Sequence, residues 1–471
     1  MSFAHATALQ AILGPEGLIT AADKLRGYET PLRHGAGKAA AVLRPANAAE
    51  VSAALAYCVR HGLRVIAQGG NSGLVGGSTP DASGTEWVLS LSRLNRKIEV
   101  DAANRTVSVD AGVRLSALNA ALLPHGLWFP IDLGSDPAIG GMVATNTGGA
   151  RFIRYGDVRR NLRGLEVVLA DEKGTVLQLG SGLRKDNTGL DLKQLFVGCN
   201  GALGVITRAE LEVQRRPQQT AAALLVPRDD EAILELLTAL ETGAGEYLSA
   251  FEGLSQGALE HTLARFPRLS NPFGSHRIPD YSVLVELSRS WPARETEQTL
   301  EDVLTQLIEP LLADGLLRDA FIGREKDLWD IRHCLSEGLR SSGQVVGFDL
   351  AVRRADIPRF RRHMKASLAG QFADFRVCDF GHIGDGGLHF NLLAKTPADA
   401  ARVAALREFV IGQLVREFGG SFSGEHGLGR ANQDWYDRYK PAEQRRFAGA
   451  IQRLLVAGEL GTVRLGGDKA P

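Results

Sequence analysis

The stretch "QGGNSGLVGGSTP" (68–80) places five glycines and several small polar residues directly after the short apolar segment "RVIA". Three more segments of the first half share this composition: "DLGSDPAIGGMVATNTGGARFIRYG" (132–156), "RKDNTGLDLKQLFVG" (184–198) and "GALGVIT" (201–207). Glycine lets backbone N–H groups turn toward a ligand and approach it closely. Successive N–H groups of this kind form an anion site suited to a pyrophosphate. Four such segments together predict a cradle for a cofactor, because turns between strands rarely need so much glycine.

The bulk composition excludes several classes of protein. A chain of 471 residues is too long for one hydrophobic core and indicates two or three domains. Basic and acidic residues are equal at 54 each, so no net charge favours nucleic acid or an anionic membrane. The four cysteines are far apart with no C-x-x-C motif, which argues against a disulfide scaffold, a zinc ribbon or an iron–sulfur cluster.

The amino-terminal sequence lacks the pattern of a secretory signal, and no apolar run approaches the roughly 20 residues needed to span a bilayer. We therefore expect a cytoplasmic protein with no transmembrane segment.

Strand and helix patterns divide the chain into three parts. Up to residue 215, short apolar strands alternate with glycine-containing turns. From 216 to 420, helical patterns such as "RETEQTLEDVLTQLIEPLLADG" alternate with strands such as "YSVLVELS", an order that favours helices packed on one face of an antiparallel sheet. The last part, 421–471, contains "SGEHGLG" and a final helix. The sequence thus predicts an α+β fold with domains 1–215 and 216–420 and a segment 421–471 that completes the active site.

The stretch "GHIGDGGLHFN" (381–391) holds two histidines seven residues apart. If Asp385-Gly386 forms a two-residue hairpin loop, His382 and His389 are directly opposed. Opposed side chains in such a pair lie about 4.5–5.5 Å apart at their β-carbons. Asn391 then points to the same side as His389. The stretch is therefore predicted to bring two imidazoles together.

Two imidazoles need a third ligand to bind a divalent metal while leaving a position open, as catalytic zinc sites do. The segment "SGEHGLG" (423–429) offers Glu425 and His426 on a loop flanked by glycines, where little blocks a close approach. Farther upstream, "KDLWDIRHCLSEGLRSSG" predicts a helix in which Arg332 and Ser336 share a face. An arginine fork is suited to a substrate carboxylate.

A different class of enzyme shares one short motif with the chain. Residues 253–257, "GLSQG", form a G-x-S-x-G pattern with a strand pattern before it and a helix pattern after it, as in the nucleophile elbow of serine hydrolases. Ser255 would then be the nucleophile. This alternative leaves the glycine segments and the His/Glu residues without a role.

The glycine segments, in order and spacing, resemble the FAD-binding domain of the vanillyl-alcohol oxidase and p-cresol methylhydroxylase superfamily. The similarity covers about residues 38–430 and is strongest to the D-2-hydroxyacid dehydrogenases, a group that includes D-lactate and D-2-hydroxyglutarate dehydrogenases and the glycolate oxidase flavin subunit. It implies a p-cresol-methylhydroxylase-type FAD domain, a substrate (cap) domain, and a C-terminal segment that returns to the FAD domain. The residues that it implies for FAD binding are Gln68, Gly69, Gly70, Asn71, Ser72, Gly73, Leu74, Gly77, Ser78, Asp132, Leu133, Gly134, Ser135, Ile139, Gly140, Gly141, Ala144, Thr145, Asn146, Gly148, Gly149, Tyr155, Gly156, Gly204, Val205 and Ile206.

The resemblance also implies how the flavin is held. Members of the superfamily that bind flavin covalently through the first loop use a histidine near the position of Asn71. Asparagine cannot form that bond, so we expect a non-covalent FAD. The family has Gly-Ser-Glu-Gly where this chain has Gly198-Cys199-Asn200-Gly201. It has a closing Asn-Pro-Gly-Lys where this chain has "VRLG" (463–466).

The family motif H-x-G-D-G-N-x-H matches the histidine stretch, with Gly387 where asparagine is usual, and the motif E-H-G matches the Glu-His loop. The resemblance implies that His382, His389 and Glu425 bind a divalent metal, usually zinc, and that His426 is the base. A bound cation can lower the pKa of coordinated water by as much as about 8–9 units, and the same effect on a substrate hydroxyl would stabilise the alkoxide. A neutral imidazole, with an unperturbed pKa near 6.5, could accept the proton.

The implied reaction is oxidation of a D-2-hydroxy acid, such as D-2-hydroxyglutarate or D-lactate, with hydride transfer from Cα to flavin N5. Arg332, Ser336 and Asn391 are the expected substrate contacts. Gly347 stands where related D-2-hydroxyglutarate dehydrogenases have a lysine, which leaves Arg353 and Arg354 as candidate replacements. The expected electron acceptor is an electron-transfer flavoprotein, a quinone or a cytochrome.

Three flavin-based alternatives stay open at this point, together with a homodimeric state. One is an oxidase of the same fold, or a glycolate-oxidase-like subunit. The second is a flavin-dependent alkylglycerone-phosphate synthase, which the predicted metal cluster disfavours. The third is a flavin-binding module without catalytic activity.

Overall fold

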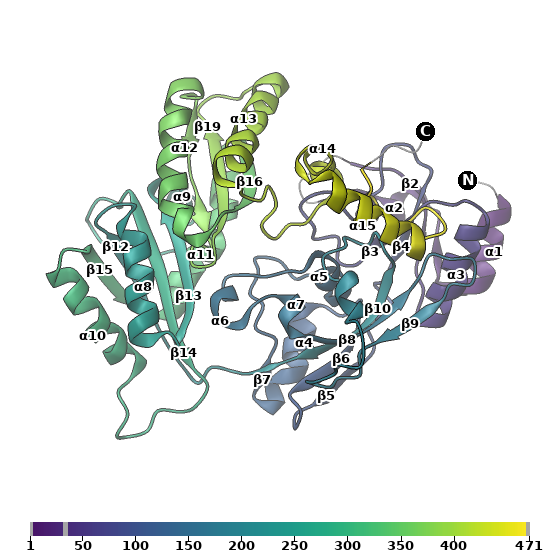
Figure 1. The fold of residues 1–471 in the computed structure, drawn as a ribbon, viewed down its shortest axis with the longest axis horizontal. Helices are drawn as coiled ribbons and strands as arrows, with labels where there is room; N and C mark the ends of the chain where they lie inside the picture. The colour runs from purple at the N-terminus through teal and green to yellow at the C-terminus, as the bar shows by residue number, and fades with distance from the viewer. Residues whose placement is uncertain (1–2, 32–35, 468–471) are drawn as a thin grey trace.

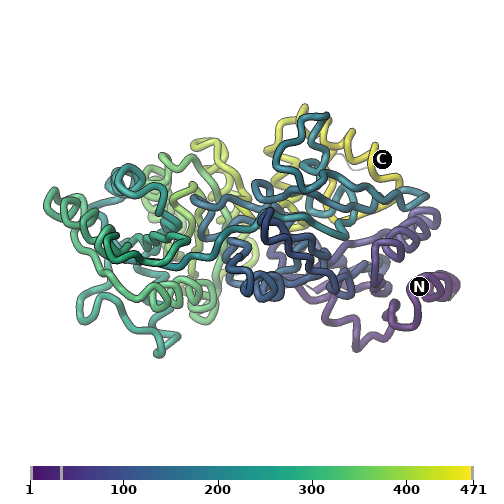
Figure 2. Tube along the Cα trace, turned by 90° about the horizontal axis from the view of Figure 1, so that it is seen from below, coloured from purple at the N-terminus to yellow at the C-terminus, as the bar shows by residue number. Residues whose placement is uncertain are grey.

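The structure is a computed structural model and describes residues 3–31 and 36–467. Two halves lie side by side, the amino-terminal half drawn in purple and blue and the middle of the chain in green (Figure 1). In both views the yellow carboxyl-terminal segment lies on the same half as the amino terminus (Figure 2). This arrangement confirms the predicted α+β fold, including the return of the last segment to the first half.

The first half contains two separate sheets. In the first sheet, β2 and β3 run parallel to β4, and β1 adds an antiparallel edge, in the order β1-β2-β4-β3. The second sheet is antiparallel, in the order β5-β6-β10-β8-β9. The strands of both sheets are β1 (Leu18–Ile19), β2 (Ala39–Leu43), β3 (Val65–Gln68), β4 (Glu86–Ser90), β5 (Ile98–Asp101), β6 (Thr106–Asp110), β8 (Leu162–Val168), β9 (Val176–Leu179) and β10 (Val205–Glu212).

Seven helices cover or connect these sheets in the described part of the first half. The helix α3 is capped at its first turn, where the Asn47 side chain accepts the backbone N–H of Glu50 at 2.9 Å, and its apolar face enters the core. The helices are α1 (Phe3–Leu13), α2 (Ala22–Glu29), α3 (Ala48–Arg60), α4 (Leu115–Leu122), α5 (Ile139–Thr145), α6 (Phe152–Tyr155) and α7 (Val158–Asn161). A short pair, β7 (Leu127–Trp128) and β11 (Gln214–Arg215), ends this half.

The second half is built on one eight-stranded sheet with β16 at one edge and β15 at the other. Its central strands β13 and β14 are buried along their whole lengths, as their apolar sequences predict. The strands are β12 (Gln219–Pro227), β13 (Leu248–Ser255), β14 (Tyr281–Arg289), β15 (Leu317–Gly323), β16 (Val345–Ala351), β17 (Phe375–Val377), β18 (Phe380–Gly381) and β19 (Gly387–Ala394). The helices are α8 (Ala232–Ala244), α9 (Gln256–Arg265), α10 (Leu300–Ala313), α11 (Glu325–Arg340), α12 (Ile357–Gln371) and α13 (Ala400–Phe418).

Helices pack on both faces of this sheet rather than on one. Two separate apolar clusters show this, because alternate residues of β12 and β13 belong to different clusters. The helices α8, α10, α12 and α13 contribute to one cluster, and α9 and α11 contribute to the other. The prediction of helices on a single face was therefore wrong. A central strand buried on both sides needs a helix layer on each side.

The carboxyl-terminal helices α14 (Gly429–Tyr439) and α15 (Ala442–Leu455) lie against the first half (Figure 1). Arg430 of α14 pairs with the buried Glu86 of β4 at 2.6 Å, and the backbone N–H of Gly461 donates to Val65 of β3 at 2.8 Å. The loop 421–428 therefore has to cross from the second half to the first. The boundaries at residues 215 and 420 stay predictions, although the chain does pass from β11 to β12 at 215–219.

The turn between His382 and His389 differs from the predicted two-residue hairpin loop. His389 pairs across the ladder with Phe380, not with His382, and residues 382–386 form a longer turn. The backbone N–H of Gly384 donates to Phe251 of β13 at 3.1 Å, a long-range contact that draws the turn away from a tight hairpin. The predicted register was therefore wrong.

Across 3–31 and 36–467, no helix is both long and apolar enough to cross a bilayer.

Candidate active site

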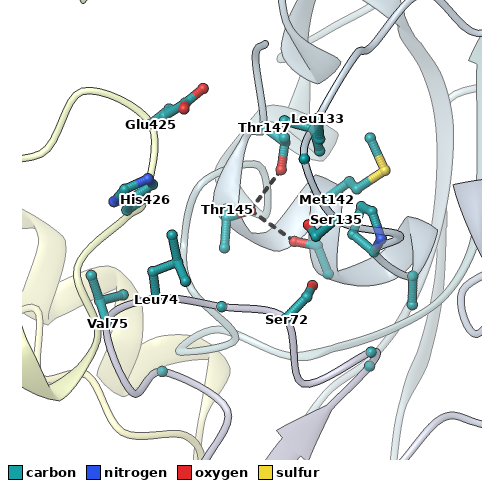
Figure 3. A pocket seen from close by; sticks show the side chains of 18 of the residues that line it. Ser72, Leu74, Val75, Leu133, Ser135, Met142, Thr145, Thr147, Glu425 and His426 are labelled. Carbon is teal, nitrogen blue, oxygen red and sulfur yellow. Dashed lines mark hydrogen bonds between the residues drawn. The ribbon is translucent and has the colours of Figure 1, made fainter. Parts of the chain in front are cut away.

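A cavity of about 390 Å³ lies between the two halves. The glycine segments of the first half form one wall, and α11, the 380–391 region and the loop around Glu425 contribute to the other. Figure 3 shows Glu425 and His426 on the crossing loop, on one side of the pocket, with Thr145 and Thr147 near its centre. The cavity therefore joins residues far apart in the sequence.

Most of the residues expected to bind FAD line this cavity. They are Gln68, Gly69, Gly70, Asn71, Ser72, Gly73, Leu74, Gly77, Ser78, Asp132, Leu133, Gly134, Ser135, Gly140, Gly141, Ala144, Thr145, Gly204 and Ile206. The first loop is held closed by Gln68, whose side-chain amide donates to the carbonyls of Tyr28 at 3.0 Å and Ser78 at 2.7 Å. Asn71 adopts the left-handed backbone conformation, at φ 51°, that asparagine tolerates.

Seven of the expected FAD residues do not line the cavity. Ile139 and Val205 are buried in the core of the first half because they sit on inward faces of α5 and β10. Asn146 ends α5 and donates to Asp157 at 2.8 Å. The others are Gly148, Gly149, Tyr155 and Gly156, of which Tyr155 lines a different cavity.

The cavity fits a large ligand at the glycine positions. A β-carbon added at Gly73, Gly134 or Gly141 would meet no protein atom within 4 Å. Protein packing therefore does not require glycine at these three places. Side chains there would instead project into space that a cofactor can fill.

The imidazoles of His382 and His389 lie close together as predicted, although the turn between them differs from the predicted one. The ring centroids of His382 and His389 are 5.1 Å apart. Their Nε2 atoms approach the same oxygen of Glu425, at 3.5 and 3.4 Å respectively. Two ligands bound tetrahedrally at about 2.1 Å from a zinc ion are about 3.4 Å apart. These separations therefore fit a metal site formed by His382, His389 and Glu425.

A second, overlapping donor set lies beside the first. Asp349, His389, Glu425 and His426 each offer one donor atom, and these atoms lie within 4.8 Å of one another. Asp349, however, is already occupied, because Oδ2 accepts the backbone N–H groups of Glu425 at 2.9 Å and His426 at 2.7 Å. Its carboxylate therefore fixes the Glu-His loop in place. The ring of His426 stacks on His389, with centroids 5.6 Å apart and planes at 15°.

Glu252 of β13 connects His382, a predicted metal ligand, to Arg332, the predicted substrate contact. Its carboxylate contacts Nδ1 of His382 and accepts Nε of Arg332, both at 2.7 Å. Burial alone would raise the pKa of Glu252, but His382 and Arg332 lower the pKa to about 2. Glu252 is therefore ionised, and it fixes which nitrogen of His382 faces Glu425.

The ionisation of the three predicted metal ligands is set by burial and by one another. Burial alone would raise the pKa of Glu425, but His382, followed by His426 and Arg332, lowers the pKa to about 2. Burial, together with the nearby His382 and His426, lowers the pKa of His389 well below its ordinary value. Burial would also lower the pKa of His382, yet Glu252 and Glu425 raise it well above the ordinary value. A carboxylate and a neutral imidazole are the forms that bind metals, so Glu425 and His389 are in the binding form, whereas His382 has to release a proton when a metal binds.

The expected substrate residues all line the cavity. Arg332 and Ser336 lie one turn apart on α11, and Asn391 follows His389 on β19. Arg332 uses Nε and Nη2 to contact Glu252, and the structure gives Nη1 no partner among residues 3–31 and 36–467. Arg353 and Arg354 pair instead with Asp356 and Glu241, and neither lines the cavity, so neither replaces the missing lysine.

The departure at Asn200 has a structural role in the crossing loop. Asn200 lines the cavity, and its side-chain oxygen accepts the backbone N–H of Leu428 at 3.1 Å. A β-carbon at Gly427, where φ is +86°, would meet that oxygen at 2.2 Å. The glycine after the Glu-His pair therefore lets the loop approach the first half.

Sequence reasoning missed Glu252 and Asp349 as members of the site. Each is a single acid in an otherwise apolar strand, "LSAFEGLS" and "VVGFDLA". A charged residue at a buried strand position needs a partner, so this pattern could have marked both. It also missed Trp329, His333, Glu337, Arg340 and Phe380, which line the same cavity.

The predicted serine-hydrolase residue lies elsewhere. Ser255 ends β13 and caps α9, with its hydroxyl accepting the backbone N–H of Ala258 at 3.5 Å. The expected strand-turn-helix is present, but Ser255 is only 5% exposed. Its position fits a helix cap rather than an accessible nucleophile.

Comparison with known families identifies the cofactor. Residues 39–180 match the model of the FAD binding domain, and residues 216–455 match that of the C-terminal domain of FAD linked oxidases. The chain belongs to the FAD-linked oxidases. It is an FAD-dependent oxidoreductase, and the glycine-lined cavity of this oxidoreductase is where FAD fits.

Curated relatives of this FAD-linked oxidase cover nearly the whole chain. A mitochondrial D-2-hydroxyglutarate dehydrogenase of Arabidopsis thaliana is 33% identical over 94% of the chain and 78% of the relative. The mitochondrial D-2-hydroxyglutarate dehydrogenase of Danio rerio is 35% identical over 94% and 81%. A D-2-hydroxyglutarate dehydrogenase of Stutzerimonas stutzeri is 30% identical over 95% of both chains.

Solved structures of more distant proteins share the fold. A p-cresol methylhydroxylase with substrate bound superposes with a TM-score of 0.76 at 16% identity, covering 98% of this chain and 96% of the other. An alkyldihydroxyacetonephosphate synthase gives a TM-score of 0.72 at 16% identity, with coverage of 97% and 86%. At this identity the likeness concerns the fold alone.

Proposed function

We propose that this FAD-dependent oxidoreductase oxidises a D-2-hydroxy acid to the 2-oxo acid, with a divalent metal at His382, His389 and Glu425 and with His426 as the base. The observation that carries the proposal is the approach of both imidazoles to one Glu425 oxygen at the wall of the FAD cavity. Oxidation of an alcohol requires removal of a hydroxyl proton and of a hydride from the same carbon. FAD supplies the hydride acceptor when it is bound.

The metal residues form the part of the site that would receive the hydroxyl. When a metal is bound there, it supplies Lewis acidity that favours the alkoxide. We place the ligands at His382, His389 and Glu425 rather than at Asp349, because Oδ2 of Asp349 already accepts two backbone N–H groups. The Glu252 carboxylate contacts Nδ1 of His382 and thereby orients the ring, as residues that contact metal ligands commonly do.

His426 has the surroundings of a general base. It lines the cavity, and its Nδ1 lies 3.6 Å from Asp349 Oδ2. A carboxylate behind an imidazole stabilises the imidazolium that forms when the outer nitrogen takes a proton. His426 is therefore proposed to accept the hydroxyl proton, with Asp349 as a positioning residue.

Arg332 is proposed to hold the substrate carboxylate. Its free Nη1 and the Ser336 side chain lie on the cavity side of α11. An arginine fork suits a carboxylate because it donates several hydrogen bonds in one plane. The named relatives are D-2-hydroxyglutarate dehydrogenases. This chain has Gly347 at the position of the lysine found in that group, so the substrate panel should also include D-lactate-like acids.

The proposal is tested by anaerobic reduction of the flavin with D- and L-2-hydroxy acids, before and after chelation. We expect loss of the oxidised flavin absorbance near 450 nm with D-acids in the metal-containing protein. L-acids should leave the spectrum unchanged. If D-acids bleach the flavin equally well after metal analysis shows none left, the metal assignment fails. If no acid of the panel bleaches it, the substrate class fails, and a non-catalytic flavin module is favoured.

Oxygen consumption in a separate aerobic assay with the same acids separates a dehydrogenase from an oxidase of the same fold. An oxidase would pass electrons to oxygen directly, whereas a dehydrogenase needs an added acceptor. The non-covalent flavin, the electron-transfer flavoprotein, quinone or cytochrome acceptor, the homodimer and the cytoplasmic location stay predictions.

A further inference from the structure

A second cavity, of about 250 Å³, lies where the two halves meet and shares no lining residue with the FAD cavity. Four arginines line it: Arg105, Arg154, Arg160 and Arg215. None of its lining residues is acidic. A protein with equal numbers of basic and acidic residues thus gathers four positive charges around one small space.

None of these four guanidinium groups has an ion pair within the described parts of the chain. Only Arg154 is held, donating through Nη1 to the Tyr247 carbonyl and to Ser288 Oγ, both at 3.0 Å. For Arg105, Arg160 and Arg215, the structure gives no side-chain hydrogen bond or ion pair within 3–31 and 36–467. Arg160 and Arg215 are exposed, so an anion from solvent can reach the four positive charges.

Two acidic residues close to these arginines in the sequence already have other ion-pair or hydrogen-bond partners. Glu212 pairs with both Arg163 and Arg184. Asp157 accepts the side-chain amide of Asn146 at 2.8 Å and the backbone N–H of Arg160 at 3.0 Å. Neither carboxylate is among the groups that line the cavity. The charge of the cluster is therefore left for a ligand.

Two backbone features support a specific arrangement of the arginines. Arg105 has φ +54°, and the other described non-glycine residues with positive φ (Asn71, Asn146 and Asn200) are all asparagines. Arginine tolerates this conformation less well than asparagine or glycine does. At Gly156 an added β-carbon would lie 2.5 Å from Cδ of Arg160, so glycine makes room for that side chain.

We propose that this cavity binds a small oxyanion with at least two negative charges, such as a phosphate or a polycarboxylate. Guanidinium forks bind carboxylate and phosphate oxygens in pairs, and several forks favour a multiply charged anion. A volume of about 250 Å³ suits a small ion and is below the usual range for drug-sized ligands. The inference is independent of the proposed oxidation chemistry.

The position of the cavity indicates what the anion does. Arg105, Arg154 and Arg160 belong to the first half, and Arg215 belongs to β11, directly before the second half begins. Ser290 follows β14 of the second half and also lines the cavity. A bound anion would join the linker to both halves and stabilise their arrangement, because a ligand that binds only the folded state raises its stability.

The test is titration of the FAD-loaded protein with inorganic phosphate and, separately, with citrate, at constant ionic strength. Calorimetry should show saturable binding of at least one probe, and the thermal midpoint should rise with that probe. Arg105→Gln and Arg215→Gln should each weaken binding by about tenfold or more, as expected for loss of a charge-assisted hydrogen bond. Arg277→Gln is the matched control, because Arg277 is 83% exposed and lies outside the lining.

The two probes distinguish the chemical class of the ligand. Binding of phosphate alone supports a phosphoryl ligand, and binding of citrate alone supports a polycarboxylate. Binding of both supports a site that recognises charge without further selection. The proposal is overturned if neither probe binds saturably at millimolar concentration, or if both arginine variants bind as tightly as the unmodified protein.

Discussion

Asp349 Oδ2 accepts the backbone N–H of His426 at 2.7 Å, although the two residues are 77 positions apart in the chain. The same oxygen accepts the N–H of Glu425 at 2.9 Å, and Asp349 is itself directly opposite His389 in the β16–β19 ladder. One carboxylate on an edge strand thus sets the position of the crossing loop relative to β19. The loop brings a proposed ligand and the proposed base to the FAD cavity together.

We predict that Asp349→Asn slows flavin reduction by roughly 10²-fold or more, because a neutral amide stabilises the imidazolium of His426 less well. FAD content should be unchanged, because Asp349 does not line the FAD cavity. Metal content should also be unchanged if the ligands are His382, His389 and Glu425. Stopped-flow reduction and metal analysis measure these quantities, with the exposed Asp314→Asn as the control. Loss of the metal from Asp349→Asn would instead assign Asp349 as a ligand.

His426→Asn should lower the rate of flavin reduction by about 10²–10⁴-fold, the usual contribution of a general base. Binding of FAD should change far less, because the glycine segments of the first half supply most of the cavity wall. The comparison is between the reduction rate and the affinity for FAD of the same variant. His276→Asn, at an exposed loop position, should leave both unchanged. Equal losses of rate and FAD binding would mean that His426 has a structural role only.

Removal of the metal should abolish substrate oxidation and leave the oxidised flavin spectrum in place. The metal residues lie at one wall of the cavity, whereas Gly73, Gly134 and Gly141 face open space in the FAD part. Dialysis against a chelator, followed by metal analysis and readdition of zinc, measures the effect. His382→Ala should prevent restoration by zinc, because its Nε2 is one of two imidazole nitrogens at the Glu425 oxygen. Full activity in protein shown to be free of metal would contradict the proposed ligands.

The sequence contained enough information to predict the residues that act through local motifs. The glycine segments and the His-x₆-His and Glu-His motifs were found because their spacing is short and their chemistry is recognisable. Glu252 was missed because its partner His382 is 130 positions away and the strand around Glu252 looks like ordinary core. The register of the histidine turn was wrong for a related reason, since the bond from Gly384 to Phe251 joins distant strands.

The assignment of Tyr155 and Gly156 to the flavin shows a different limit. Both end the glycine segment 132–156, yet Tyr155 of α6 lines the second cavity and neither residue lines the FAD cavity. Their contact with FAD stays a prediction from the continuity of the motif. Gly156 instead makes room for Arg160.

The contact between the two halves should depend strongly on Glu286, which is 1% exposed. Its carboxylate accepts Nε and Nη2 of Arg151 at 2.9 and 2.8 Å and the indole N–H of Trp329 at 2.7 Å. Glu286→Gln removes the main counter-charge of Arg151 and leaves Asp132 and Glu325 beside it, so we expect a cost of about 1–3 kcal/mol, as for lost hydrogen bonds to a charged group. The urea midpoint should fall accordingly, whereas the exposed Glu295→Gln should change it little. A midpoint unchanged in Glu286→Gln would show that the pair does not contribute to stability.

Cys334 should be the only thiol of the native protein that reacts with a disulfide reagent at pH 8. Burial raises the pKa of Cys58 and of Cys378 to about 12, so only about one molecule in 10⁴ carries either thiolate at that pH. Burial also raises the pKa of Cys199 and of Cys334, but Cys334 is only partly buried, so it is the thiol that a reagent can reach directly. The thiolate fraction of Cys58 and Cys378 becomes large only as the pH approaches 12, so labelling of these two cysteines should stay slow at neutral pH.

Counting released thiolate chromophore gives the number of reactive thiols. The native protein should release one equivalent and the unfolded protein four, because all four cysteines are free. Cys334→Ser should remove the native signal, and Cys58→Ser should leave it unchanged. Rapid labelling of more than one native thiol at pH 8 would show that a buried cysteine is reached by opening of the core, since its thiolate is too rare in the closed state to react.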